Sequence, residues 1–188
     1  MNWSPLVAAG LAESALASTE DRWLHTRSVA RFALELQART GDVSAAVVAA
    51  AWLHDVGYGP EMVDTGFHPL DGASWLRIQG IPEGIVALVA YHSGAIFEAE
   101  ERGLLVALAD FTEPDPDQLD MLTLVDMAVG PTGERVSVKS RLDEILSRYP
   151  ADHPVNRAVK RSRPSLIESA ERAAMKLGLA DVRTHAPV

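Results

Sequence analysis

Nine consecutive apolar residues, 45–53, run directly into the sequence His54-Asp55-Val56-Gly57. Alanine and leucine favour helix, and a helix that is apolar on every side belongs in the middle of a helical bundle. The run is well short of the roughly 18 apolar residues that a membrane-spanning helix needs. Gly57 is a natural end for a helix. We therefore expect a central helix over residues 44–56, surrounded by other helices.

The rest of the chain also predicts helices, and the strict alternation of apolar and polar residues that marks a strand is hard to find. Glycine and proline residues mark several of the expected boundaries. We expect helices over residues 6–17, 21–39, 69–80, 85–91, 118–129, 138–149, 155–161 and 165–177. The sequence thus predicts an all-α fold, a compact helical bundle with extra C-terminal helices.

Composition excludes several kinds of chemistry. The 188-residue chain has no Cys, which rules out disulfides, Cys-ligated zinc, iron–sulfur clusters and thiol nucleophiles. Its net charge of −9 makes it a poor partner for a nucleic acid duplex, which attracts basic surfaces. No signal-peptide pattern begins the sequence, and no apolar run is long enough to span a bilayer. We therefore expect a cytoplasmic protein with no membrane partner and no nucleic acid duplex as a partner.

Three apolar segments end in an ionisable residue shortly before a glycine: Asp55, His92 and Asp126. A carboxylate near a helix C-terminus faces the negative end of the helix dipole. Burial adds several kcal/mol unless the charge is paired or bound to a metal. Nothing cationic is adjacent in sequence to Asp55 or Asp126. A buried divalent cation would relieve both costs.

Histidines supply further candidate ligands. His25 shares the apolar face of its expected helix, and His68 directly precedes Pro69 at the start of another. A single histidine on an apolar face is more often a hydrogen-bonded core residue than a metal ligand. The coincidence of several such residues favours a site for Fe, Mn, Ni or Zn, which histidine and aspartate bind well. His68 and His92 could complete a second metal position.

The series His25, His54-Asp55, His68, His92, Asp126 resembles the HD-domain superfamily of metal-dependent phosphohydrolases. The matching strings occupy residues 22–30, 53–57, 68–73 and 91–93, and 29 residues separate His25 from His54. The resemblance covers a core over about residues 22–131. It implies one HD domain over residues 1–188, with C-terminal helices over 138–180 packed on that core.

The resemblance also implies a role for each residue. Four residues would hold a first divalent metal ion: His25, His54, Asp55 and Asp126. His68 and His92 would hold a second ion, with Asp55 bridging the two and acting as the catalytic residue. Asp110 competes with Asp126 for the last position, but it leads into an acidic, proline-broken stretch that indicates a solvated loop.

One departure from the family concerns phosphate. Many members continue His-Asp-x-Gly with Lys, which can meet a phosphate group, whereas Tyr58 stands at that position here. Tyr58 is thus a candidate substrate-binding residue. Arg135 and Lys139 follow the last expected ligand closely, and they are candidates for reaching a substrate phosphate, although surface salt bridges are an equal alternative.

The function expected from this resemblance is metal-dependent hydrolysis of a phosphate ester in a nucleotide or a similar small metabolite. Two alternatives stay open. Some HD-fold enzymes with this six-residue set use two iron ions and O₂ to oxidise a substrate. The absence of the phosphate-contacting Lys is consistent with this alternative. The other alternative is a non-catalytic module that binds a metal or a nucleotide.

Overall fold

A computed structural model describes residues 4–180 and 182, and within them the fold is all-helical, with a single isolated β-bridge between Val129 and Arg135 in place of any strand. The α-helices are α1 (Pro5–Leu16), α2 (Glu20–Thr40), α3 (Ala45–Leu53), α4 (His68–Ile78), α5 (Glu83–Tyr91), α6 (Ala95–Arg102), α7 (Leu105–Leu108), α8 (Pro116–Met127), α9 (Val138–Arg148) and α10 (Pro154–Lys176). Two short 3₁₀ helices are η1 (Val56–Tyr58) and η2 (His92–Gly94). The expected fold class is confirmed.

The apolar helix α3 lies in the middle of the bundle, as its composition predicts. It packs against α1, α2, α5 and α8, and every residue from Val47 to Leu53 is buried. The Ser44 hydroxyl caps its start by accepting a hydrogen bond from the Val47 N–H. The helix ends at Leu53, earlier than expected, and a 3₁₀ turn carries the chain through Gly57.

Gly57 does not serve as a helix cap. It lies where η1 meets α4, and a Cβ atom built there would stand 2.1 Å from the carbonyl oxygen of His68 and 2.7 Å from the amide nitrogen of Gly72. The absent side chain therefore lets two backbones approach closely. This approach fixes the end of α3 against the start of α4, and both of these segments carry candidate ligands.

The C-terminal helices differ from expectation in one respect. Residues 155–161 and 165–177, expected as two helices, form the single helix α10, with Pro164 inside it. Proline has no N–H for the helical hydrogen bond, which is why the sequence suggests a break there. The helix continues because it packs along α8 and α6, where Leu166, Ala170 and Ala173 are buried.

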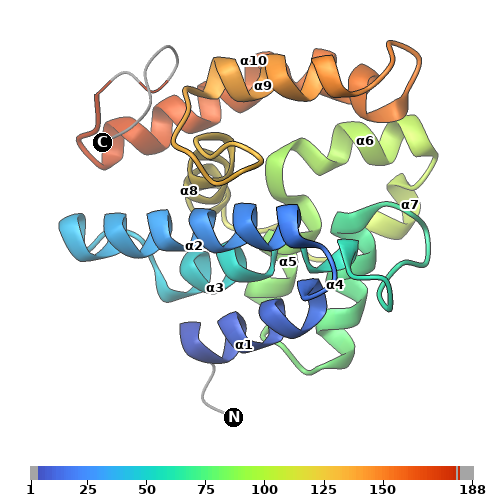
Figure 1. The fold of residues 1–188 in the computed structure, drawn as a ribbon, viewed down its shortest axis with the longest axis horizontal. Coiled ribbons are helices and arrows are strands. Elements are labelled where there is room, and N and C mark those ends of the chain that lie inside the picture. Colours follow the sequence, from blue (N-terminus) through green and yellow to red (C-terminus); the bar gives the residue numbers. More distant parts are fainter. Residues whose placement is uncertain (1–3, 181, 183–188) are drawn as a thin grey trace.

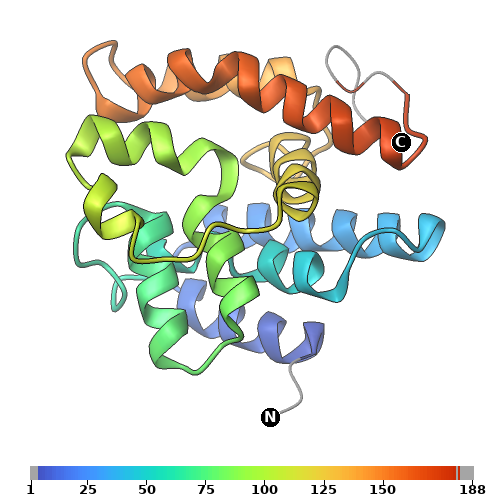
Figure 2. The ribbon, with the colours of Figure 1, turned by 180° about the vertical axis from the view of Figure 1, so that it is seen from behind.

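Helices α6 and α7 were not expected. Helix α6 lies between Gly94 and Gly103, which both adopt positive φ, and it packs beneath α10 (Figures 1 and 2). Together α6, α8, α9 and α10 enclose one side of the bundle. In the part of the chain that the structure describes, no helix has the length and apolarity needed to cross a membrane.

Candidate metal centre

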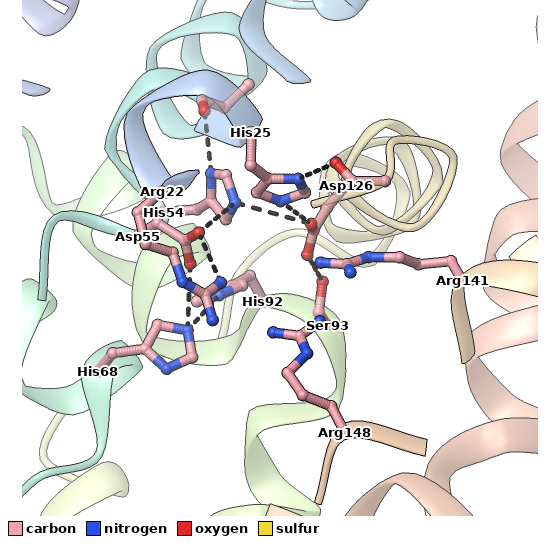
Figure 3. A network of polar contacts seen from close by, with 12 residues as sticks. Arg22, His25, His54, Asp55, His68, His92, Ser93, Asp126, Arg141 and Arg148 are labelled. Carbon is pink, nitrogen blue, oxygen red and sulfur yellow. Dashed lines mark hydrogen bonds and ion pairs between the residues drawn. The ribbon is translucent and has the colours of Figure 1, made fainter. Parts of the chain in front are cut away.

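Six ligand-type side chains from separate parts of the fold meet at one place (Figure 3). They come from α2, from the end of α3, from the start of α4, from the end of α5 and from α8. The residues are His25, His54, Asp55, His68, His92 and Asp126. All are buried except His68, which is half-buried. Segments up to 101 residues apart in sequence thus supply one polar cluster inside an apolar bundle.

The six residues divide into two adjacent clusters of three. In the first cluster, His25, His54 and Asp126 place one ligand atom each within 4.8 Å of the others. Here Nε2 of His25 lies 3.0 Å, and Nε2 of His54 3.7 Å, from Oδ1 of Asp126. Such spacing lets three donor atoms surround one ion.

The second cluster contains Asp55, His68 and His92. Nε2 of His68 lies 3.1 Å from Nε2 of His92 and 3.4 Å from Oδ1 of Asp55. The other carboxylate oxygen of Asp55, Oδ2, lies 3.6 Å from Nε2 of His54 in the first cluster. Asp55 therefore presents one oxygen to each cluster.

Backbone carbonyls orient three of the imidazoles. In each case Nδ1 lies within hydrogen-bond distance of a carbonyl oxygen: His25 with Gly130 (3.0 Å), His54 with Ala51 (3.0 Å) and His92 with Val89 (2.6 Å). A carbonyl only accepts, so Nδ1 carries the proton and donates. In the neutral ring the lone pair is then on Nε2, which points into the cluster. Metal-binding histidines are commonly held in this way.

The donor set fits divalent metal ions. Nε2 of His54 is buried and has no hydrogen-bond partner, which is costly for a polar atom in a protein interior. Nε2 of His25, which holds a lone pair in the neutral ring, faces a carboxylate oxygen at 3.0 Å. A cation between these atoms would satisfy both. Imidazole nitrogens and carboxylate oxygens suit Fe, Mn, Ni or Zn.

The protonation states also favour ligation. Burial by itself would raise the pKa of Asp55, but His54, Arg22 and His68 outweigh it and hold that pKa well below its usual range. Asp126 follows the same rule: burial opposes ionisation, but His54 and His25 keep its pKa low. Burial lowers the pKa of both His68 and His92. At neutral pH these groups are charged carboxylates and neutral imidazoles, the forms that bind metals.

Asp126, rather than Asp110, joins the cluster. Asp110 is exposed, and its backbone carbonyl accepts a hydrogen bond from Arg77. The second oxygen of Asp126 accepts a hydrogen bond from the hydroxyl of Ser93. Ser93 is the one non-glycine residue with positive φ in the described part of the chain. Such backbone strain concentrates at functional sites, and here it directs Ser93 at Asp126.

Of the three candidate substrate-binding residues, the structure places one at the cavity and two outside it. Tyr58 lies at the cavity beside the clusters, stacked on His68 with 4.1 Å between ring centroids. The guanidinium of Arg22 lies 4.0 Å above the same tyrosine ring and 3.3 Å from Oδ2 of Asp55. Arg135 and Lys139 are not among the residues that line this cavity. Arg135 instead stacks over Phe32 and pairs with Glu35, because the short loop after α8 turns it back toward α2.

Three arginines line the cavity together with the clusters: Arg22, Arg141 and Arg148. Sequence reasoning missed all three as site residues. Arg22 stands three positions before His25, on the adjoining turn of α2. This spacing places both side chains on the same face of the helix, and it could have identified Arg22 as a site residue. Arg141 and Arg148 belong to an amphipathic helix whose spacing alone does not distinguish a cavity-facing arginine from a solvated one.

Comparison with known proteins identifies one family. The family described as HD domain matches residues 22–115. This range contains five of the six clustered residues and ends before Asp126, which the geometry adds. No curated protein and no solved structure matches the chain.

Proposed function

The chain belongs to the HD domain family, and on that premise we propose that it is a metal-dependent phosphohydrolase. The substrate would be a phosphate ester of a nucleotide or a similar small metabolite. One observation carries the proposal: two adjacent His/Asp clusters, linked by Asp55, open on a cavity that arginines also line. Paired metal sites beside cationic side chains are suited to phosphoryl chemistry.

The residues of each cluster would hold one divalent ion, with His25, His54 and Asp126 around the first, and His68 and His92 around the second. Asp55 would contact both. Bound metal ions would supply a water nucleophile that is ionised near neutral pH, and they would offset negative charge on the phosphoryl group.

The protein's own groups prepare the site for this reaction. The carbonyls of Gly130, Ala51 and Val89 hold three imidazoles in the tautomer that leaves Nε2 free. Ser93 keeps Asp126 in place. Arg22 pairs with Asp55 and also lines the cavity, where its guanidinium can donate to a substrate phosphate oxygen. These groups are in position before substrate arrives, which reduces the reorganisation that the reaction requires.

The test is a metal and substrate screen. Protein purified without chelator is loaded separately with Mn²⁺, Fe²⁺, Ni²⁺ or Zn²⁺ and assayed for phosphate release from phosphomonoesters and phosphodiesters. We expect release that depends on the metal, stops with chelator and continues without O₂. The Asp126→Asn variant should lose activity, and Asp110→Asn, which changes an exposed carboxylate, should keep it.

Two results would contradict the proposal. Turnover that requires O₂ would indicate the oxidative chemistry expected as an alternative from the sequence. Metal binding without release of phosphate from any substrate class would indicate a binding module instead.

A further inference from the structure

Arg141 and Arg148 lie on one face of α9, the face that meets the metal cavity. They are seven residues apart, which is two helical turns, and both line the cavity. In Figure 3 both side chains extend toward the His/Asp clusters. Neither residue falls within residues 22–115, the range that matches the HD family, so the family match assigns no role to either.

Arg141 is unusual because it is almost completely buried. It is 4 % exposed, and its Nε has no hydrogen-bond partner in the structure. A buried guanidinium with an unpaired N–H is costly, and proteins rarely keep one without a partner. The cavity into which it faces is where a partner could enter.

The local charges leave an excess of cations at this wall. Glu144 pairs with Arg141 through Nη1 and with Arg148 through Nε and Nη2, so one carboxylate serves two guanidiniums. Glu98, which also lines the cavity, is paired with Arg102. The two remaining carboxylates of the cavity, Asp55 and Asp126, belong to the metal clusters. An anion of matching shape would balance the surplus charge.

Part of the cavity lining is apolar. Ile145 lies between the two arginines along α9, and Val155 and Val159 of α10 also line the cavity. The ring of Tyr149 extends this wall and stacks on His153. A ligand with one charged end and one apolar or aromatic end fits such a lining.

We propose that Arg141 and Arg148 bind the phosphate group of a phosphate monoester, and that Ile145, Val155 and Val159 contact its ester group. Guanidinium groups match phosphate oxygens with paired N–H donors, which single ammonium groups cannot do. This inference rests on the proposed function, since it names the substrate class of the same site. It also replaces Arg135 and Lys139, the phosphate-binding candidates from the sequence, with two residues that line the cavity.

The test measures binding without turnover. The probe is inorganic phosphate, titrated by calorimetry into protein loaded with stoichiometric Mn²⁺ and desalted. We expect Arg148→Gln to raise the Kd for phosphate by about tenfold, which corresponds to about 1.4 kcal/mol. Arg148→Lys keeps the charge but not the paired donors, so its Kd for phosphate should lie between those of the wild type and Arg148→Gln. The matched control is Arg163→Gln, since Arg163 pairs with Asp143 and does not line the cavity.

Arg141→Gln should have an effect of at least the same size. Because Arg141 is buried, the melting temperature and the metal content of the Arg141→Gln variant must be measured in parallel. If this variant does not fold, Arg148→Gln alone provides the test. With phosphate monoesters, both variants should raise KM more than they lower kcat. Metal content should stay at the wild-type value in Arg148→Gln.

The outcomes separate this inference from the proposed function. Normal phosphate affinity and normal KM in both variants would overturn the inference while leaving metal-dependent hydrolysis intact. A protein that binds phosphate through these arginines but hydrolyses no ester would support the inference and contradict the hydrolase. Wild-type protein that binds no phosphate would overturn the inference.

Discussion

His25 and Asp126 are 101 residues apart in the chain, and yet Nε2 of the histidine lies 3.0 Å from Oδ1 of the aspartate. The carbonyl of Gly130 fixes the opposite ring nitrogen of His25, and Ser93 fixes the opposite oxygen of Asp126. The two facing atoms are thus held in place from behind, each by a separate partner. This arrangement is typical of residues that share a metal ion.

The first prediction concerns the last ligand. Asp126→Asn should remove at least one metal ion per chain, since an amide is neutral and does not replace a carboxylate in the first cluster. Metal content measured by plasma mass spectrometry checks this. The control Asp110→Asn should bind as much metal as the wild type, because Asp110 is exposed and outside both clusters. Equal loss in both variants would show that the geometry does not identify the ligand.

The second prediction compares Asp55 with His92. Asp55→Ala removes the carboxylate that faces both clusters, so it should lower metal content, activity and stability together. His92→Ala should affect only the second cluster. An ion that binds only the folded state raises stability by mass action. Since His92→Ala keeps the first cluster, excess Mn²⁺ should raise its Tm more than that of Asp55→Ala. Full metal content and normal turnover in Asp55→Ala would contradict the assignment.

Local sequence patterns were sufficient to predict much of this architecture. An apolar stretch without polar faces predicts a central helix, and α3 is one. The apolar face of its expected helix predicted an inward position for His25, and the apolar segment that ends in Asp126 indicated burial of that carboxylate. Both residues are buried in the structure. Burial follows from periodicity, so residues on apolar faces were predictable.

Other features depend on tertiary contacts that no local pattern encodes. Helix α10 continues through Pro164 because packing on α8 and α6 outweighs the lost hydrogen bond. Arg22 reaches Asp55, 33 residues away, only once α2 and α3 pack together. Arg141 and Arg148 look like solvated positions of an amphipathic helix until α9 covers the cavity.

The third prediction tests the contact between η1 and α4. Gly57→Ala should destabilise the fold by about 1–3 kcal/mol or more, since the added Cβ would clash with the backbone of His68 and Gly72. The backbone displacement that relieves this clash should also move His68 and reduce metal binding in the second cluster. The matched control is Gly84→Ala on α5, where a Cβ meets nothing within 4 Å. It should leave stability unchanged or raise it by up to about 1 kcal/mol, as urea unfolding would show.

The fourth prediction concerns pH. Burial holds the pKa of His68 and His92 below the ordinary value of 6.5 in the folded protein, so below that pH the unfolded chain binds more protons. The free energy of unfolding of metal-free protein should therefore fall as pH drops from 7 to 5, by at most about 1.4 kcal/mol per pH unit for each histidine. The fall should be shallower in His92→Gln. Identical slopes in variant and wild type would contradict the argument.

The most direct test of the proposed two-metal centre is anomalous X-ray diffraction from crystals of Mn²⁺-loaded protein. The account predicts two anomalous peaks about 3.5–4 Å apart, one among His25, His54 and Asp126 and one between His68 and His92, with Asp55 between the peaks. Crystals with no anomalous peak at these residues, or with manganese bound only elsewhere on the chain, would contradict it.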